Sequence, residues 1–315
     1  MRWIFMGTPE WALPSLEALL NAGEEVAGVL TQPDRPVGRK QVQTPSAVKV
    51  RAQELGIPVF TPERVGDSIG QEALRTLRPE ALLVCAYGQL LPQSVLDLPP
   101  QGCYNLHFSL LPRWRGASPV QAAIAAGDAH TGVSLQKMVM KLDAGPLVAR
   151  SEVVPIQAQD TSETLGARLA SLGGELIRDA LPLLSGGAPE AQPQDEAQVT
   201  ICRILRKEQG RIHWDQDTAV SLERRLRAFT PWPGLYCFGP DGKRLQLTQV
   251  EARAESDGGS EAASVPGIVL PEFFVGTAEG TLQVLRLRPE GKGEMTATEF
   301  LRGRSDWVGK HLRAS

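Results

Sequence analysis

The sequence predicts an α/β protein with a doubly wound, mostly parallel sheet, followed by a small C-terminal β-barrel domain. Through the first half of the chain, short apolar runs alternate with segments of helical spacing, which is typical of a parallel sheet covered by helices. Residues 186–194 have the small, Pro-rich composition of a linker. Beyond them, short strand-like runs with turns at 240–242 and 279–280 favour a barrel. The 315 residues, 42% of them hydrophobic, suffice for the cores of two domains.

The first half opens on a strand, a turn and a helix. Residues 2–6 are an apolar strand, 7–10 a turn, and 11–22 a helix that ends at Gly23. The same rhythm predicts further elements at residues 26–30, 46–55, 57–60 and 81–86. The turn at 7–10 lacks the GxGxxG spacing that brings backbone close to a pyrophosphate, so a nicotinamide dinucleotide site is not favoured.

A polar pair marks the next strand, within the run GCYNLHFSLLPRWRG at residues 102–116. Asn105 and His107 are two apart, so their side chains leave a strand on the same face. Pro112 cannot donate to a strand ladder, so the chain leaves the sheet soon after the pair. Because open α/β sheets bind ligands where strand ends feed loops, we place the chemistry here. The alternative for such a pair is a histidine and an amide satisfied within the core.

A carboxylate follows farther along the chain, where Asp143 lies on the turn 141–146 before an apolar run. Beside His107 it would favour the imidazolium form. An amide N–H and a charged imidazole aimed at one point can hold the oxyanion of a tetrahedral intermediate. The carboxylate can orient the histidine and help to relay a proton. The alternative is that Asp143 caps its own turn, as Asp in turns commonly does.

A strand end and a long loop supply further candidates. Residues 84–88 end a strand at Tyr87 and Gly88, where backbone N–H and C=O groups could bind the edge of a heterocycle; the alternative is an ordinary strand end. Residues 31–45 form a polar connection that is unusually long for such a sheet, so we expect a functional or mobile loop. Its cations are Arg35, Arg39 and Lys40, which could equally be solvated surface charges.

The rest of the chain is predicted to surround Asp143 and then to form the barrel. We expect helices or strands at residues 119–126, 133–139, 147–154, 161–184 and 219–229, with Thr161 or Ser162 as the cap of the long amphipathic helix. Residues 255–264 are expected to be a mobile hairpin tip. The barrel half collects the cations Arg203, Arg206, Lys207, Arg211, Lys243, Arg244, Arg286 and Arg288. Small barrels often bind nucleic acid, although scattered cations are also typical of a solvated surface.

Charge, cysteines and hydropathy limit the remaining possibilities. The net charge of −3 and the pI near 5.9 do not favour nucleic-acid binding by the chain as a whole, so such contacts must rest on local patches. The four cysteines are too scattered for a zinc site or a CxxC motif, and we expect reduced thiols. No apolar run approaches the roughly 20 residues that span a bilayer, and the N-terminus has no signal-peptide pattern. We expect a cytoplasmic protein.

Two long strings make a resemblance visible. NLHFSLLPRWRGASPVQAAIAAGD and TGVSLQKMVMKLDAGPL resemble the active-site segment of the methionyl-tRNA formyltransferase family. The resemblance also includes MGTPEWALPSLEALL, TQPDRPVGR, VCAYGQLLP and RAFTPWPG, so it covers almost the whole chain. Three positions depart from the family pattern: Phe108 stands where a smaller residue is expected, Pro146 where an acid is expected, and His213 where an aspartate is expected.

The resemblance implies a Rossmann-like formyltransferase fold with three parts. Residues 1–188 would be the catalytic domain, 189–205 a linker, and 206–315 an OB-like domain that binds tRNA. The implied catalytic residues are Asn105, His107 and Asp143. The implied tetrahydrofolate-binding residues are Ser109, Leu110, Leu111 and Pro112, to which we add Tyr87 and Gly88. The loop with Arg35, Arg39 and Lys40 would engage the tRNA acceptor end, with Arg39 as its principal arginine.

The implied reaction moves a formyl group from 10-formyltetrahydrofolate to the α-amine of methionyl-initiator tRNA, giving N-formylmethionyl-tRNA for translation initiation. No metal is expected, and we expect a monomer without a membrane partner. One alternative is a sister folate-dependent formyltransferase that acts on glycinamide ribonucleotide or an amino sugar. A second is a non-catalytic RNA-binding protein that keeps the fold, which the intact Asn105, His107 and Asp143 argue against.

Overall fold

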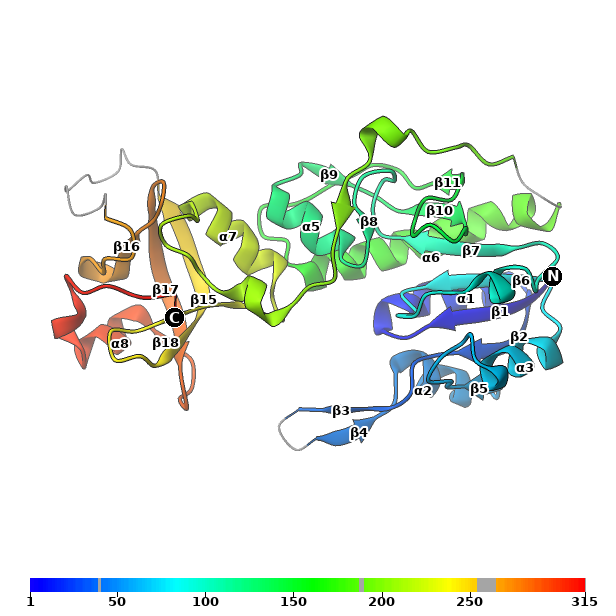
Figure 1. Ribbon diagram of the computed structural model, residues 1–315, viewed down its shortest axis with the longest axis horizontal. Helices are drawn as coiled ribbons and strands as arrows, with labels where there is room; N and C mark the ends of the chain where they lie inside the picture. Colours follow the sequence, from blue (N-terminus) through cyan, green and yellow to red (C-terminus); the bar gives the residue numbers. More distant parts are fainter. Residues whose placement is uncertain (39–40, 187–189, 254–264, 315) are drawn as a thin grey trace. The chain divides into compact units, whose positions relative to one another are not determined.

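The computed structural model describes residues 1–38, 41–186, 190–253 and 265–314 (Figure 1). The chain forms two compact units. The first unit comprises Met1–Pro119, His130–Pro155 and Leu165–Arg203, and the second comprises Val120–Ala129, Ile156–Thr164 and Ile204–Ser315. Residues 190–203, most of the predicted linker, therefore belong to the first unit. The predicted limits at 188 and 205 stay a proposal.

The first unit is built on a sheet in which seven described strands follow the order β11-β10-β7-β6-β1-β2-β5. Its members are β1 (Arg2–Gly7), β2 (Glu25–Leu30), β5 (Val59–Phe60), β6 (Ala81–Cys85), β7 (Cys103–His107), β10 (Ser134–Lys137) and β11 (Leu147–Arg150). The run from β7 to β5 is parallel, and β10 and β11 are antiparallel to their neighbours. The predicted mostly parallel sheet is confirmed.

Helices cover both faces of this sheet, which explains its nearly continuous apolar strands. The helices that contribute are α1 (Leu13–Asn21), α2 (Ala47–Glu54), α3 (Ser68–Leu77), α4 (Gln93–Leu96) and α6 (Ser162–Ser185). Helices α3 and α4 share a core with Ile4, Met6 and Cys103 on one face of the sheet. On the other face, α6 packs its Gly173 against Leu106. Asn105 and His107 alternate with Leu106 and so lie on the face of Cys103.

Local sequence explains most helix starts. Ser46 Oγ accepts from Lys49 N at 3.0 Å to cap α2, and Thr161 Oγ1 accepts from Thr164 N at 3.3 Å at the start of α6. The sequence patterns missed α3, which Asp67 caps through Gly70 N. The predicted helix at 11–22 is divided between η1 (Glu10–Ala12) and α1.

Short strand pairs complete the first unit. They are β3 (Arg35–Val37) with β4 (Val42–Thr44), β8 (Arg115–Gly116) with β13 (Ile201–Cys202), and β9 (His130–Thr131) with β12 (Val154–Pro155). The loop expected at 31–45 thus contains an antiparallel pair. The strand expected at 147–154 is two strands, β11 and β12, that join different sheets.

The second unit is built on an antiparallel sheet of five described strands that curls into a half-barrel (Figure 1). These are β14 (Leu235–Phe238), β15 (Arg244–Arg253), β16 (Phe274–Gly276), β17 (Thr281–Pro289) and β18 (Met295–Thr296). Register shifts between Leu247 and Val250 interrupt the long β15–β17 pair, and such irregularities bend a sheet. The predicted β-barrel-like C-terminal fold is confirmed in this form. The expected hairpin tip at 255–264 lies outside the described residues.

Helices and 3-10 turns accompany this sheet. They are α5 (Pro119–Ala126), α7 (Ala219–Ala228), α8 (Ala297–Arg302), η3 (Lys207–Gly210), η6 (Pro271–Phe273) and η7 (Ser305–Trp307).

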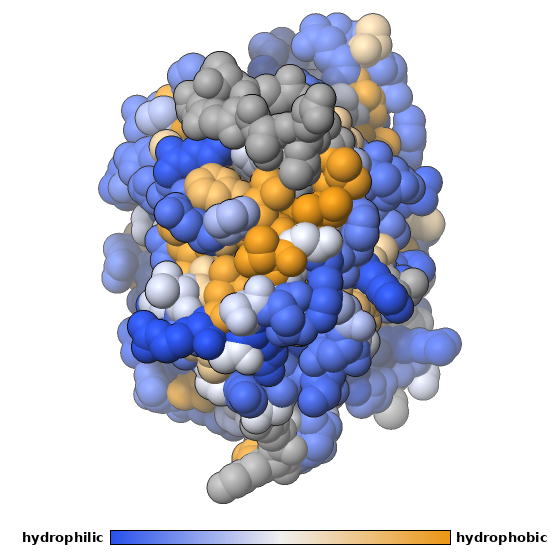
Figure 2. Space-filling view, turned by 90° about the vertical axis from the view of Figure 1, so that its left-hand side faces the viewer, coloured by the Kyte–Doolittle hydropathy of each residue, from blue (hydrophilic) through white to orange (hydrophobic). Residues whose placement is uncertain are grey.

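Seen from the side of α8 and β16, the second unit carries an apolar patch within a polar surface (Figure 2). Val265 and Val308 are exposed apolar residues of the second unit. Within the described ranges, no helix is both long enough and apolar enough to cross a membrane.

Candidate active site

Strand β7 delivers Asn105 and His107 to its carboxyl end, opposite two polar residues of β10. Asn105 pairs with Gln136, and His107 pairs with Ser134. Paired residues of neighbouring strands project from the same face, so the four polar side chains lie together. The Ser134 and Gln136 residues are 0% and 2% exposed. Polar groups at such depth require hydrogen-bond partners, and the structure supplies them.

The carboxylate of Asp143 binds several polar groups of the site. Its Oδ1 accepts from Gln136 Nε2 at 2.9 Å and from Asn105 Nδ2 at 3.3 Å, and its Oδ2 accepts from the Gly116 N–H at 2.9 Å. Oδ1 also lies 3.7 Å from His107 Nδ1. The three residues singled out in the sequence therefore meet at one carboxylate. These partners all lie outside the turn 141–146, so the Asp143 side chain does more than close its own turn.

Both nitrogens of the histidine ring face oxygen atoms. Nε2 lies 2.8 Å from the carbonyl oxygen of Trp114, and because a carbonyl can only accept, Nε2 carries a hydrogen. Nδ1 faces the Asp143 carboxylate at 3.7 Å, which is too long for a hydrogen bond but close for a charge contact. A second proton, on Nδ1, would place an imidazolium against that carboxylate. The side chains of His107 and Asp143 are 6% and 8% exposed.

The segment after β7 is tied to β10 through Ser134. Ser134 Oγ donates to the Ser109 carbonyl at 2.7 Å and accepts from the Leu111 N–H at 3.0 Å, while Ser109 Oγ donates to the Arg113 carbonyl at 2.6 Å. Leu111 is buried and Leu110 is half-buried; the bond from Leu111 to Pro112 is cis. The structure thus brings Ser109 to Pro112, the predicted folate-binding residues, directly next to His107 in a fixed loop.

Tyr87 and Gly88 lie beyond β6, the neighbour of β7 in the sheet. The Tyr87 side chain belongs to the apolar core, and burial raises the pKa of its phenol. Its carbonyl accepts from Thr8 Oγ1 at 2.8 Å and from Gln32 Nε2 at 3.2 Å. Thr8, Gln32 and Tyr87 each follow a parallel strand, so they mark the same carboxyl edge of the sheet as His107.

Of the three cations predicted to contact tRNA, the structure describes Arg35. Arg35 begins β3 with its side chain 59% exposed, and its Nη2 lies 3.1 Å from Glu63 Oε2. Arg39 and Lys40 lie outside the described residues. Among the predicted cations of the second unit, Arg286 and Arg288 reach the same carboxylate, that of Glu294, at 2.6 and 3.7 Å.

The three departures from the family pattern lie in different surroundings. Phe108 is 7% exposed and its ring centroid lies 6.2 Å from that of Trp11, so the larger side chain fills the core. The Pro146 carbonyl accepts from the Lys137 N–H at 2.9 Å, so this residue contributes backbone to the edge of β10. The His213 N–H donates to Asp217 Oδ2 at 2.8 Å.

Sequence reasoning missed part of the site. Gln136 could have been found, because it stands two residues after Ser134 in a predicted strand, as His107 does after Asn105. Gln194 gave no signal, because it stands in the Pro-rich stretch, yet its Nε2 donates to the Asp143 carbonyl at 2.9 Å. Arg115 is 1% exposed and donates through Nη2 to Glu196 at 2.8 Å. Hydrogen bonds from Arg115 and then from Lys141 lower the pKa of Glu196 to about 2.

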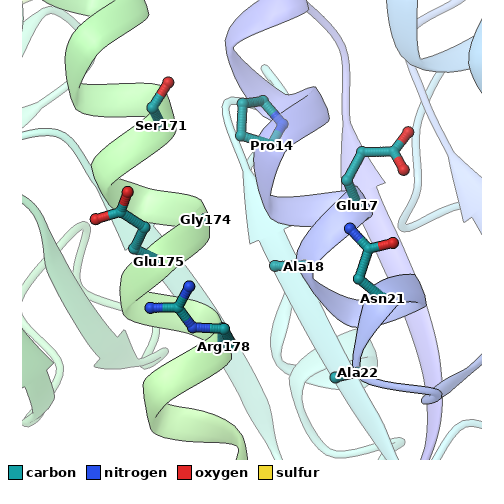
Figure 3. A pocket seen from close by; sticks show the side chains of 9 residues that line it. All are labelled: Pro14, Glu17, Ala18, Asn21, Ala22, Ser171, Gly174, Glu175 and Arg178. Carbon is teal, nitrogen blue, oxygen red and sulfur yellow. The ribbon is translucent and has the colours of Figure 1, made fainter.

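Other features of the first unit do not add to this site. A groove of 380 Å³ lies between α1 and α6, which form its two walls (Figure 3). It is lined by Pro14, Glu17, Ala18, Asn21, Ala22, Ser171, Gly174, Glu175 and Arg178. In the part of the chain that the structure describes, no three His, Cys, Asp or Glu side chains group as metal ligands. All four cysteines are buried free thiols, and burial raises the pKa of Cys202 to about 11.

Family models match both halves of the chain. Residues 1–181 match the family described as formyl transferase, and residues 204–305 match the formyl transferase C-terminal domain. The first match covers more than half of the 315 residues and includes Asn105, His107 and Asp143.

Solved structures of similar fold come from several proteins. HypX from Aquifex aeolicus, in complex with tetrahydrofolic acid, is 19% identical with a TM-score of 0.63; the alignment covers 96% of this chain and 47% of HypX. This chain thus spans about half the length of HypX. WlaRD, a sugar 3N-formyl transferase, is 15% identical with a TM-score of 0.64, covering 93% of this chain and 99% of that one. An N-formyltransferase from Helicobacter canadensis is 17% identical with a TM-score of 0.63, covering 89% and 97%. At these identities the likeness concerns the fold.

Proposed function

The chain belongs to the formyl transferase family, and from that premise we propose that it transfers a formyl group from 10-formyltetrahydrofolate to the α-amine of methionyl-initiator tRNA. The observation that carries the proposal is the meeting of Asn105 and His107 at the Asp143 carboxylate, at the carboxyl edge of the sheet. The product is N-formylmethionyl-tRNA, and we propose that the enzyme works as a monomer in the cytoplasm.

In the proposed reaction the amine attacks the formyl carbon, and the formyl oxygen becomes an oxyanion. Asn105 gives one amide hydrogen to Asp143 and keeps a second for the oxyanion. A protonated His107 adds a positive charge beside the same carboxylate. Asp143 holds the ring and helps to carry the proton that the amine loses. The bond from the formyl carbon to N10 of the folate then breaks, and N10 receives that proton.

Preorganisation supports these roles. The Asp143 carboxylate accepts from Gln136, Asn105 and Gly116, so little reorientation is needed when charge develops on the substrate. The ring of His107 is held by the Trp114 carbonyl at 2.8 Å. Fixed donors in a site of low exposure stabilise charge more strongly than the same donors in water.

Folate binding is proposed for the loop of Ser109, Leu110, Leu111 and Pro112, together with the backbone at Tyr87 and Gly88. The support is positional, because both segments follow neighbouring strands at one sheet edge. Proteins of similar fold hold folates: HypX is in complex with tetrahydrofolic acid, and the Helicobacter canadensis enzyme is in complex with folinic acid and dTDP-3-aminofucose.

The tRNA is proposed to bind Arg35, Arg39 and Lys40 and the basic residues of the second unit. Arg35 supports this with its exposed side chain. Because the whole chain carries a net charge of −3, the attraction must come from these local cations. The sugar N-formyltransferases among the similar structures make a sugar amine the alternative acceptor.

The decisive experiment gives the pure protein 10-formyltetrahydrofolate and one acceptor at a time. The acceptors are methionyl-initiator tRNA, the amino sugar of dTDP-3-aminofucose, and glycinamide ribonucleotide. We expect rapid formylation of the charged tRNA, at least about a hundredfold above the other two in kcat/KM. Faster transfer to the sugar or to glycinamide ribonucleotide would replace the proposed acceptor, and no transfer to any of them would remove the proposed activity.

A further inference from the structure

The segment 190–203, which we call the strap, runs along the active-site loops of the first unit. Gln192 and Leu147 exchange backbone hydrogen bonds at 2.8 Å. Thr200 Oγ1 accepts from the Trp114 N–H at 2.8 Å, and β13 of the strap pairs with β8. A Cβ added to Gly116 would lie 1.9 Å from the Cys202 carbonyl oxygen, so the two backbones touch. The strap therefore contacts the loop that supplies Gly116 to Asp143 and the strand β11 that follows the Asp143 turn.

Gln194 is a buried residue of the strap, at 9% exposure, and its side chain reaches the Asp143 turn. Its Nε2 donates to the carbonyls of Asp143, at 2.9 Å, and Gly145, at 2.7 Å. Its Oε1 accepts from Arg115 Nε at 2.9 Å. Carbonyls only accept and a guanidinium only donates, so chemistry fixes which end of the amide is nitrogen.

The amide acts on a turn that is not in a relaxed conformation. Asp143 has φ of 49°, in the left-handed region that non-glycine residues seldom adopt. Its carbonyl points to Gln194, while its carboxylate points to Asn105, Gln136 and Gly116. The carbonyl and the carboxylate belong to the same residue, so a rotation of the turn that moved the carbonyl would also move the carboxylate away from His107. Gln194 binds the backbone carbonyl of Asp143, whereas Asn105 and His107 contact its carboxylate.

Arg115 holds Gln194 in turn. Its side chain is 1% exposed and bridges Gln194 to Glu196, which also lies 2.9 Å from Lys141 Nζ on the same turn region as Asp143. A carboxylate, a guanidinium and an amide thus form a chain from the surface to the Asp143 carbonyl.

We propose that Gln194 is a positioning residue of the active site, which orients Asp143 toward His107 through the turn carbonyls. Gln194 is the one side chain of the strap to which the proposal gives this role. The kinetic consequence rests on the proposed function, but the effect on His107 does not. Positioning errors act on the transition state, so turnover should suffer while substrate binding stays close to normal.

The test uses two substitutions of Gln194 in the full chain. Gln194→Ala removes the amide, and Gln194→Glu keeps the shape and the acceptor for Arg115 but cannot donate to the two carbonyls. The matched control is Gln198→Ala, because Gln198 is an exposed glutamine of the same strap whose Nε2 bonds Asp195. Each protein is assayed with 10-formyltetrahydrofolate and methionyl-initiator tRNA, and its thermal unfolding is recorded.

We expect both Gln194 variants to lower kcat by about tenfold or more, with KM for each substrate changed less than about threefold. The control should match the wild type. Unchanged kcat in Gln194→Glu would overturn the proposal, because donation to the turn would then be dispensable. Loss of the native fold in both variants would also overturn it, since Gln194 would then serve folding.

A second readout needs no substrate. The chain has four histidines, so the ring-nitrogen resonances of His107 can be assigned by substitution. In both Gln194 variants these resonances should shift, while those of His130, His213 and His311 stay in place, as all four should in Gln198→Ala. An unshifted His107 would overturn the positioning role. If the wild type fails to formylate charged tRNA but His107 shifts, the proposed acceptor fails and the positioning role stands.

Discussion

The active site of the first unit and the sheet of the second unit use polar side chains in different ways. At the active site they are buried and share partners: Asp143 accepts from three donors, and Gln136 and Arg115 are 2% and 1% exposed. In the second unit the ion pair of Arg286 with Glu294 joins side chains that are 41% and 35% exposed. Buried groups are costly to move and so hold a geometry, whereas exposed pairs exchange partners at little cost. The first arrangement suits catalysis, and the second suits contact with a charged partner.

The largest effect should follow removal of the trio. Asn105→Ala, His107→Ala and Asp143→Ala should each lower kcat by about two orders of magnitude or more, because each acts on the same oxyanion or proton path. The loss of kcat in a double variant should be far smaller than the product of the two single losses. Formylation kinetics and folate affinity measure this, and folate affinity should change much less than kcat. A His107→Ala enzyme with near-normal turnover would remove the histidine from the mechanism.

Substitutions at Gly116 in the first unit and Gly293 in the second unit would compare how closely the two sites are packed. Gly116 has φ of 124° and donates to Asp143, and an added Cβ would meet the Cys202 carbonyl oxygen at 1.9 Å. Gly116→Ala should therefore lower the free energy of unfolding by about 2–4 kcal/mol and also reduce turnover. Gly293 of the second unit has nothing within 4 Å of an added Cβ, and Gly293→Ala should change stability by less than about 0.5 kcal/mol. Equal denaturation midpoints for the two variants would contradict the contrast.

A smaller effect is expected at Arg39, which lies outside the described residues, so the prediction rests on the sequence. Arg39→Ala should raise KM or lower kcat/KM for charged tRNA and leave folate binding near the wild-type value. Arg39→Lys keeps the charge but loses the planar fork, so partial rescue would indicate phosphate attraction and no rescue would indicate planar recognition. The log–log salt dependence of tRNA binding should be shallower in Arg39→Ala if a phosphate contact is lost. Equal damage to folate and tRNA use would refute this role.

The smallest effect compares two surface carboxylates. The pKa of Glu196 is lowered to about 2 because Arg115 and then Lys141 donate to it. Its contribution to stability is therefore present above its ordinary pKa, near 4.5, and is lost as the pH falls toward 2. Glu196→Gln should remove that part of the pH dependence. Glu196→Gln should also destabilise the protein more than Glu294→Gln at pH 7, because it leaves the buried guanidinium of Arg115 without its carboxylate partner. Melting curves from pH 7 to pH 3 measure both, and parallel curves for wild type and Glu196→Gln would argue against the pairing.

Local sequence periods were enough for most of the first unit. Apolar runs predicted β1, β2 and β6, and the two-residue spacing of Asn105 and His107 placed both on one face of β7. Such patterns work because strand and helix periods are properties of adjacent residues. Where the pattern was weak, as in α3, or where the chain paired within a polar loop, as in β3 and β4, the prediction missed the element.

The parallel sheet, the strand that carries Asn105 and His107, and the candidate carboxylate Asp143 were all predictable from the residues alone. Only the folded chain shows which groups surround that carboxylate. Gln194 lies 51 residues beyond Asp143 (194 − 143) in a stretch with the composition of a linker, yet it is buried against the Asp143 carbonyl. No local pattern encodes such a contact, because it depends on the pairing of this segment with β11 and β8, which lie far back in the sequence. Burial and hydrogen bonding between distant residues made a linker-like segment part of the site.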